Sequence, residues 1–283
     1  MAQGQRSVVV TGASTGIGRA TVQGLTRMGF RVWATVRREQ DGRALTDEHK
    51  GAVTPLLVDL LDHDSVRAAS RRVCEAGPLF GLVNNAGVAL PGPLEHLPIE
   101  AFRRQLEVNL VGQLLVTQTL LPALRTAAAE LGDARIVMIG SISGRIAGPM
   151  LGAYAASKFG LAGLSESLRA ELAPSGIRVL LLEPGAIATP IWERGLAAGN
   201  KLQQEFPAEA SRYRFQIQAA EQMAERGSRR GLPPDRAAQV IVAALTLPNP
   251  RPRQVVGRDA KVAAMLARVL PYRLLYRMTA ARR

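Results

Sequence analysis

Short apolar runs recur along the chain and are separated by longer stretches in which the apolar residues follow a helical spacing. These runs predict strands at residues 7–12, 31–37, 53–60, 79–87, 134–141, 177–185 and 253–257. They are apolar continuously instead of at alternate positions, as expected for a parallel sheet covered on both faces. The pattern therefore predicts strands that lie between two layers of helices.

The stretches between the strands predict helices from the glycine-rich turn to residue 28 and at 62–75, 99–130 and 152–173, with Pro122 expected to interrupt the third. Alternation of strands and helices on this spacing is typical of a doubly wound α/β sheet. We therefore expect residues 1–283 to form a single domain.

Residues 186–232 break this alternation, because they are polar, mostly helical in pattern, and follow the sixth predicted strand. In open α/β sheets, ligands bind at the carboxyl ends of the strands. A long insertion at such an end predicts a lid over a substrate. Trp192, at its start, is expected either to line the substrate pocket or to pack at the hinge.

Composition narrows the class of protein. Hydrophobic residues make up 47% of the 283 positions, and no apolar run reaches the length of about 18 residues that indicates a membrane span. The first strand begins at residue 7, which leaves no length for a secretory signal, and the single cysteine excludes a disulfide within the chain. These features predict a cytoplasmic protein. The three histidines are scattered, so no metal site is expected.

The net charge of +13 is concentrated at the C-terminus, where residues 251–283 hold nine Lys or Arg and one Asp. No basic groove with interleaved aromatic residues is present, so no nucleic acid is expected as a partner. Residues 258–283 instead predict a basic amphipathic tail, with apolar residues at helical spacing: Val262, Met265, Leu266, Val269 and Leu270. Packing on the lid, contact with a second subunit and peripheral contact with an anionic membrane all fit this tail.

A glycine-rich segment, "TGASTGIGRA" at residues 11–20, follows the first predicted strand. Gly12 allows a sharp turn, Gly16 leaves space for a pyrophosphate, and Gly18 lets the following helix pack closely. The helix N-terminus then offers free N–H groups to phosphates. The plainer alternative is a tight turn that needs glycine only for its backbone angles.

The segment "YAASK" places Tyr154 and Lys158 one helical turn apart, on the same helix face. A phenol ordinarily titrates near pH ~10. A positive charge about 4 Å away is worth ~4 kcal/mol at an effective dielectric of ~20, which corresponds to about three pKa units. We therefore predict that Lys158 lowers the pKa of Tyr154 toward ~7, where it can exchange protons near neutrality. A chance pair on a helix surface would give the same short match.

Six segments, taken together and in order, resemble the motifs of the short-chain dehydrogenase/reductase family. They are "TGASTGIG", "NNAG" (84–87), "VNLVG" (108–112), "GSISG" (140–144), "YAASK" and "PGAIATP" (184–190). "RVWATVRR" and the tail are similar to members grouped with 17β-hydroxysteroid and retinol dehydrogenases. The resemblance implies a Rossmann fold and NAD(P)-dependent hydride transfer between an alcohol and its ketone or aldehyde.

The resemblance also implies the roles of four catalytic residues. Tyr154 would act as the general acid/base, and Ser141 would hold the substrate oxygen, with Ser143 as its nearest rival. Lys158 would favour the phenolate and bind the nicotinamide ribose, and Asn109 would hold a water that leads protons to Lys158.

Cofactor contacts are implied in the same way. They fall on Gly12, Ser14, Thr15, Gly16, Ile17, Gly18, Arg37, Arg38, Asp59, Leu60, Asn85, Ala86, Gly87, Tyr154, Lys158, Pro184, Gly185, Ile187 and Thr189. Members that prefer NAD carry an acidic residue at the end of the second strand, where this chain has Val36 followed by Arg37 and Arg38. With no carboxylate to repel a 2′-phosphate, we expect NADP(H) in preference to NAD(H). Two surface arginines in an arginine-rich protein would look the same.

The expected function is NADP(H)-dependent interconversion of an alcohol and its carbonyl, on a bulky apolar substrate that is steroid-, retinoid- or lipid-like. The family resemblance implies a homodimer or homotetramer. The alternative is a catalytically idle dinucleotide-binding protein with a regulatory or scaffold role. Such a protein would be expected to lack the tyrosine or the lysine, and both are present here.

Overall fold

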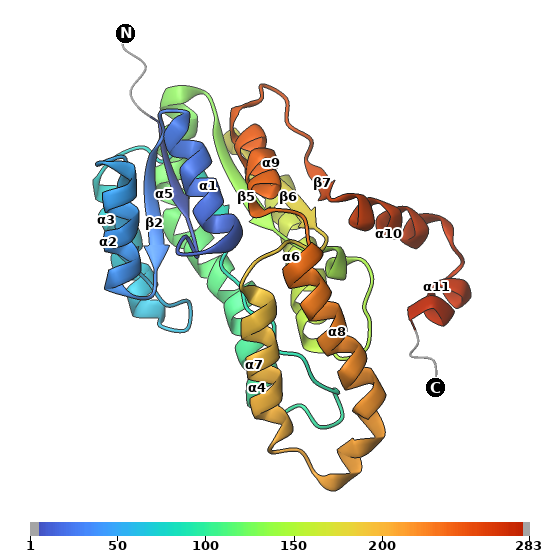
Figure 1. Cartoon of the computed structure of the whole chain (residues 1–283). Helices are drawn as coiled ribbons and strands as arrows, with labels where there is room; N and C mark the ends of the chain where they lie inside the picture. Colours follow the sequence, from blue (N-terminus) through green and yellow to red (C-terminus); the bar gives the residue numbers. More distant parts are fainter. Residues whose placement is uncertain (1–5, 280–283) are drawn as a thin grey trace.

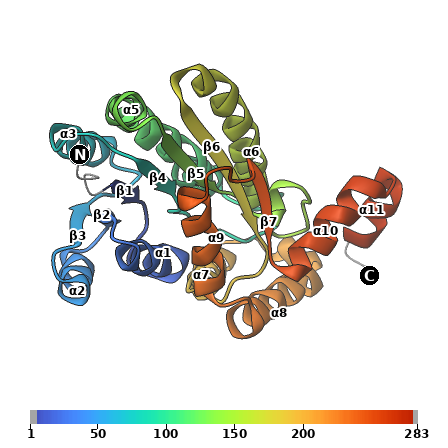
Figure 2. The same ribbon diagram turned by 90° about the horizontal axis from the view of Figure 1, so that it is seen from above.

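A computed structural model describes residues 6–279 and shows seven parallel strands in the order β3-β2-β1-β4-β5-β6-β7. The strands are β1 Ser7–Val10, β2 Arg31–Val36, β3 Val53–Leu57, β4 Gly81–Asn84, β5 Ala134–Ile139, β6 Ile177–Pro184 and β7 Arg253–Val256. The order reverses between β1 and β4, and helices cover both faces of the sheet (Figure 2). The predicted doubly wound α/β fold is confirmed.

Eleven α-helices are found in residues 6–279, and six of them cover the two faces of the sheet (Figure 2). The eleven are α1 Gly16–Arg27, α2 Glu39–His49, α3 His63–Glu75, α4 Ile99–Leu106, α5 Gly112–Leu131, α6 Gly152–Leu172, α7 Ile191–Gln203, α8 Arg214–Arg230, α9 Pro234–Thr246, α10 Arg258–Val269 and α11 Tyr272–Thr279. The layer of α3, α5 and α6 lies on one face, and the layer of α1, α2 and α9 lies on the other (Figure 2).

Successive residues of β1 pack into different layers, which explains why the strand is apolar throughout. Val9 belongs to a buried cluster with Leu124 of α5, whereas Val8 packs in a second cluster with Leu25 of α1 and Ile241 of α9. Both faces of the central strands are therefore withdrawn from water, as the continuous apolar runs predicted.

The expected break at Pro122 is not found, because α5 continues through this residue. Packing accounts for this, since Leu120 and Leu124 on either side of the proline are buried against the sheet and hold the helix together. The interruption lies earlier, in a π-helical turn at Glu107–Val111 that joins α4 to α5. Asn109 is buried inside this turn, and π-helical turns are frequent at functional sites.

Residues 186–232 leave the end of β6 and return beside it. Ile187 and Leu232 form an isolated parallel bridge, in which the N–H of Leu232 donates to Ala186 O at 2.8 Å and the N–H of Ala188 donates to Leu232 O at 3.0 Å. Between these points α7, a 3₁₀ helix at Ala208–Tyr213 and α8 form a helical arm that extends past the sheet (Figure 1).

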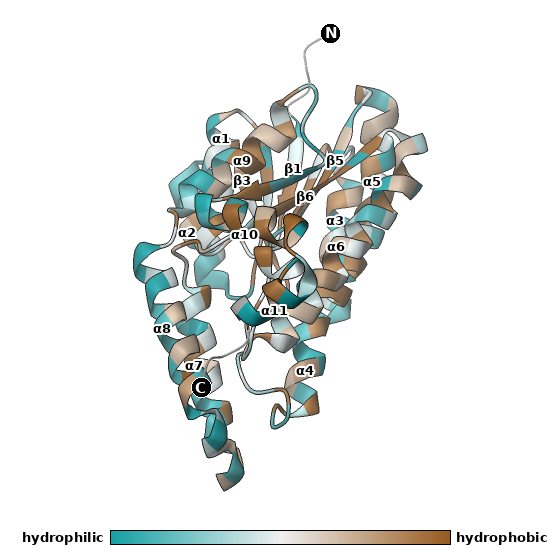
Figure 3. Cartoon of the chain, turned by 90° about the vertical axis from the view of Figure 1, so that its right-hand side faces the viewer, coloured by the Kyte–Doolittle hydropathy of each residue, from teal (hydrophilic) through white to brown (hydrophobic). Residues whose placement is uncertain are grey.

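The C-terminal segment projects from the end of β7 as α10 and α11 (Figure 1). Val262, Met265 and Val269 on α10 are exposed, so neither residues 186–232 nor any other described part of the chain covers them. Figure 3 shows this segment at the near side of the molecule, with hydrophobic and hydrophilic residues mixed along it. Within residues 6–279, no helix is both long and apolar enough to cross a membrane.

Candidate active site

Three of the four predicted catalytic residues meet at the carboxyl ends of β5 and β4. Tyr154 and Lys158 lie on successive turns at the start of α6, and the ammonium nitrogen of Lys158 is 5.7 Å from the centre of the Tyr154 ring. The Lys158 Nζ donates a hydrogen bond to Ile139 O, at the end of β5, at 2.9 Å. The Tyr154 hydroxyl is hydrogen-bonded to the side chain of Ser141, two residues after β5.

The local backbone fixes Ser141. It caps a short 3₁₀ helix at Ile142–Gly144, where its Oγ accepts a hydrogen bond from the N–H of Ser143 at 3.1 Å. The structure therefore brings the hydroxyl of Ser141, and not that of Ser143, to Tyr154. Close packing holds the two segments together, because a Cβ on Gly144 would lie 2.8 Å from Lys158 O.

The pKa of Tyr154 departs from the sequence prediction. Burial raises the pKa of the phenol above its ordinary value, and the hydrogen bond with Ser141 offsets this only in part. Burial also lowers the pKa of Lys158, to about 8, because desolvation disfavours the ammonium. The predicted lowering of the Tyr154 pKa by Lys158 is therefore wrong for the chain by itself. The charge argument placed both groups in an effective dielectric of ~20 and left out the cost of desolvating each one.

Asn109 lies beside this group and joins it to the segment after β4. Its Oδ1 accepts from the N–H of Val88 at 2.9 Å, and its Nδ2 donates to Val88 O at 2.9 Å and to the hydroxyl of Ser157 at 3.1 Å. Ser157 in turn donates to Tyr154 O at 2.7 Å. A Cβ on Gly87 would lie 3.3 Å from Asn109 Oδ1 and 3.9 Å from Lys158 Nζ.

Two further amides, which sequence reasoning missed, hold the same segment. Gln105 accepts from the N–H of Leu90 at 2.8 Å and donates to Val88 O at 2.6 Å. Gln113 donates to Ala86 O at 2.7 Å. With Asn109 they form a line of fully buried amides at four-residue spacing. That spacing on a predicted helix was the signal that could have identified them.

The glycine-rich turn has the shape that a phosphate cradle requires. Gly12 and Gly16 have φ values of +65° and +57°, and a Cβ on Gly18 would lie 2.3 Å from Gly12 O. Asn85 donates from its Nδ2 to Thr11 O at 2.8 Å, which fixes the end of β4 against the turn. Thr15, the residue before α1, makes no side-chain cap at the helix N-terminus. The free N–H groups there fit the phosphates of a dinucleotide.

One further predicted cofactor residue, Thr189, borders this turn. A Cβ on Gly16 would lie 2.9 Å from Thr189 Cγ2, so the segment after β6 approaches the glycine turn. That segment is held by Asp259 of α10, whose Oδ2 accepts from the N–H of Ala186 at 3.0 Å. Asp259 lies 73 residues away in sequence, and no local motif indicated it.

The two arginines after β2 differ in their partners. Arg38 pairs with Asp41 through two hydrogen bonds of 3.0 and 3.1 Å. Arg37 is exposed and forms no ion pair with any residue in the described part of the chain. Arg37 is therefore the guanidinium that is free to bind an anion. Asp59, on the next strand's exit, accepts from the N–H of Leu61 at 3.0 Å, and Leu60 is buried beside Gly112.

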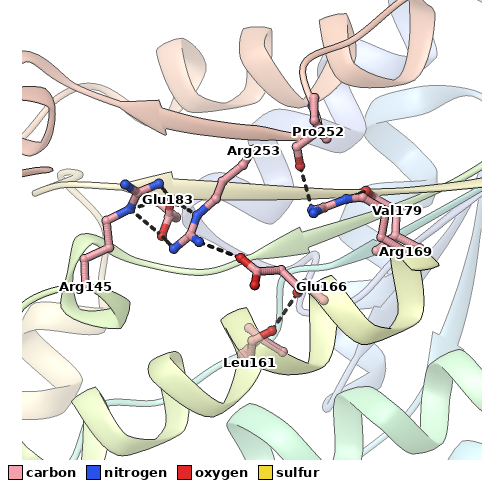
Figure 4. Close-up of polar contacts among 9 residues, drawn as sticks. Arg145, Leu161, Glu166, Arg169, Val179, Glu183, Pro252 and Arg253 are labelled. Carbon is pink, nitrogen blue, oxygen red and sulfur yellow. Dashed lines mark hydrogen bonds and ion pairs between the residues drawn. The ribbon is translucent and has the colours of Figure 1, made fainter. Parts of the chain in front are cut away.

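A buried carboxylate with two guanidinium partners lies behind the site (Figure 4). Glu183, the second-last residue of β6, is 1% exposed and pairs with Arg253 of β7 at 2.7 Å and with Arg145 at 2.5 Å. Arg253 also pairs with Glu166 of α6 at 2.7 Å. Burial by itself would raise the pKa of Glu183, but the hydrogen bonds from Arg253 and Arg145 outweigh it and keep that pKa below its ordinary value. We call Glu183, Arg145, Arg253 and Glu166 the ion-pair cluster.

An apolar cleft with an empty volume of about 540 Å³, including space open to solvent, lies between the helical arm and the segments that precede Tyr154. Residues from four segments line it: Ala89, Pro91, Gly92, Met150, Leu151, Ile191, Trp192, Gly195, Leu196, Gly199, Asn200, Gln203, Ile217, Ala220, Glu221, Met223 and Ala224. Leu151 directly precedes α6, the helix that carries Tyr154. Trp192 lines the cleft and also packs on Gly227 of α8.

Comparisons with known proteins agree with this geometry. The model of the family described as "short chain dehydrogenase" matches residues 6–198. A 3-amino-tetrahydro-pyrrolizinone reductase of Xenorhabdus hominickii is 42% identical over 70% of this chain and 67% of its own length. An NADPH-dependent 3-dehydrocapnine reductase of Ornithobacterium rhinotracheale is 31% identical, covering 95% of this chain and 94% of its own.

Two further relatives extend the comparison. Human retinol dehydrogenase 5 is 36% identical over 95% of this chain and 86% of its own length. Among solved structures, a short chain dehydrogenase from Burkholderia cenocepacia in complex with NADP superimposes with a TM-score of 0.74 at 25% identity, covering 98% of each chain.

Proposed function

This chain belongs to the short-chain dehydrogenase family, and we propose that it interconverts an alcohol and its ketone or aldehyde with NADP(H), using Tyr154 as the general acid/base. The bound nicotinamide would supply or accept the hydride. The observation that carries the proposal is the contact of Tyr154 with Ser141, one helical turn from Lys158.

Each residue then has a chemical task. Tyr154 passes its phenolic proton to the substrate oxygen during reduction and takes it back during oxidation. Ser141 donates a hydrogen bond to the same oxygen and holds it in place. Lys158 stabilises the phenolate once the proton has left. Asn109 holds the segment after β4 against α6 through its hydrogen bonds to Val88 and Ser157.

The pKa of Tyr154 favours the reductive direction. A phenol whose pKa is raised by burial keeps its proton near neutral pH, and it is therefore ready to protonate a carbonyl oxygen. Two of the relatives described above are named as reductases, which supports the same direction.

Several features support NADP(H) as the cofactor. Arg37 offers an exposed guanidinium at the end of β2, and the last residue of that strand is Val36 in place of an acidic residue. The 3-dehydrocapnine reductase is named as NADPH-dependent, and the Burkholderia cenocepacia structure contains NADP.

The lining of the cleft supports a bulky apolar substrate. Met150, Leu151, Trp192 and Ile217 give it a hydrophobic surface, as is usual for sites that bind apolar ligands. The relation to retinol dehydrogenase 5 points the same way. The intact pair of Tyr154 and Lys158 argues against a catalytically idle binding protein.

We also propose that the enzyme works in the cytoplasm as a homodimer or homotetramer. The exposed face of α10, formed by Val262, Met265 and Val269, would meet a second subunit. Peripheral contact with a membrane through the same face is the competing proposal, since basic residues border it.

The test of the catalytic proposal is the variant Tyr154→Phe, compared with Tyr272→Phe at an exposed position. Wild type is first screened with steroids, retinoids and medium-chain carbonyls, following the loss of NADPH absorbance. Tyr154→Phe should then lower kcat by about 10²-fold or more, because the proton donor is lost, while NADPH binding is retained. Tyr272→Phe should behave as wild type. Near-normal kcat in Tyr154→Phe would show that the acid/base role is misassigned.

A further inference from the structure

The cleft-facing side of α8 carries a carboxylate among small and apolar residues. Ile217, Ala220, Glu221 and Ala224 follow the three- and four-residue spacing of one helix face, and all four line the cleft. On α7, Trp192 and Leu196 face the same space. Such an inward face ordinarily holds apolar residues, so the position of Glu221 requires an explanation.

Glu221 has no counterion within the described chain. It is half-buried, and no hydrogen bond or ion pair joins it to any residue of 6–279, whereas the buried Glu183 is held by Arg145 and Arg253. No Lys or Arg is present among the residues that line the cleft. A carboxylate that faces an apolar space loses hydration, and it recovers that free energy only when a cation or hydrogen-bond donor binds it.

The position of Glu221 along the cleft sets where such a group would lie. Trp192 packs against Gly227, near the base of the helical arm, and Glu221 lies six residues before Gly227 in α8, toward the outer end of the arm. Six helical residues span about 9 Å. The carboxylate is therefore remote from the base of the arm, where Ile187 and Thr189 lie beside the glycine turn.

We propose that Glu221 selects substrates that carry a cationic amine at the end of an elongated apolar body, remote from the reacting carbonyl. This rests on the proposed function, because it assigns the substrate of that same site. The ammonium would donate to the Glu221 carboxylate, and the apolar body would lie along Ile217, Leu196 and Trp192. The negative charge of Glu221 would also disfavour substrates with an anionic group at the end that lies near this carboxylate.

Binding is tested directly with three probes of equal chain length: octylammonium, 1-octanol and octanoate. Trp192 lines the cleft, so its fluorescence reports occupancy, with Trp192→Phe as the background. Octylammonium should bind wild type about 10-fold more tightly than 1-octanol, and octanoate should bind most weakly, because a hydrogen bond to a charged group is worth that ratio or more. Glu221→Gln should remove this preference. Glu225→Gln, at an exposed position on the same helix, should retain it.

Turnover separates this proposal from the assignment of the enzyme. Wild type, Glu221→Gln and Glu225→Gln are compared on an ω-amino ketone and on its neutral methyl-terminated analogue, with NADPH. A 10-fold loss of kcat/KM for the amine alone, confined to Glu221→Gln, supports the proposal. Turnover of both ketones with no amine preference, or a preference unchanged in Glu221→Gln, overturns it and leaves the proposed function intact. Failure to reduce any carbonyl would refute the proposed function, while the probe affinities still decide the role of Glu221.

Discussion

At the scale of the residue, burial decides the electrostatics of the site more than the charge of a single neighbour does. Tyr154 and Lys158 lie as one helical turn predicts, yet the pKa of Tyr154 is raised and that of Lys158 is lowered to about 8. Both shifts favour the neutral form, which is the effect of desolvation. A neutral phenol suits proton donation to a carbonyl, so the raised pKa is compatible with the proposed role of Tyr154, although the predicted direction of the pKa shift is wrong.

The lowered pKa of Lys158 predicts a dependence of stability on pH. Between about 8 and the ordinary lysine value of ~10.4, the unfolded chain binds a proton that the folded chain has lost, so stability rises with pH through this window. Across it, wild type should gain roughly 3 kcal/mol in the free energy of unfolding relative to Lys158→Met. Urea unfolding at several pH values measures this difference. Lys261→Met, at an exposed site, should show no such trend, and a constant difference for Lys158→Met would contradict the assigned pKa.

At the scale of the element, the junction of β2 and α2 divides its two arginines between structure and binding. Arg38 precedes α2 and forms an ion pair with Asp41 in the first turn of that helix. Leu45, one turn further on, is buried in the core. Arg37 has no such partner in the described chain, and it is exposed to solvent. The sequence offered the two arginines as equals, and only the helix geometry distinguishes them.

This difference predicts unequal effects on the cofactor. Arg37→Ala should raise the KM for NADPH about 10-fold or more and leave the KM for NADH nearly unchanged, because only NADPH carries the 2′-phosphate. Arg38→Ala should have a smaller effect on NADPH, since its guanidinium is already paired. Steady-state kinetics with both cofactors measures the ratio. An equal rise for NADPH and NADH in Arg37→Ala would remove the argument for NADP(H).

At the scale of the whole molecule, the ion-pair cluster joins the turn after β5, α6, β6 and β7. Arg145 follows the Ser141 turn, Glu183 lies just before Gly185, and Arg253 precedes α10. Removing one member of a buried pair typically costs ~3–5 kcal/mol, because its partner is left buried and unpaired. α10 follows β7 and contacts the segment after β6 through Asp259, which accepts from the N–H of Ala186, while the outer face of α10 stays exposed.

The exposed face of α10 predicts a subunit contact. Wild type should elute as a dimer or tetramer in size-exclusion chromatography with light scattering, and the double variant Met265→Glu, Val269→Glu should shift toward monomer. Met28→Glu, at an equally exposed site on the far end of α1, serves as the control. A monomeric wild type that sediments with anionic phosphatidylserine vesicles would instead favour the membrane proposal.

The sequence by itself determined the features that depend on neighbours along the chain. Continuous apolar runs specify strands that are buried on both faces, and glycines at 12, 16 and 18 specify the turn. Spacing by four places Tyr154 and Lys158 on one helix face. The tertiary structure alone decided what depends on distant partners: the break at Asn109 instead of Pro122, the salt bridges of Glu183, the capping of Ala186 by Asp259, and the direction of the pKa shifts. Desolvation and long-range pairing are properties of the packed molecule, and no local pattern of residues encodes them.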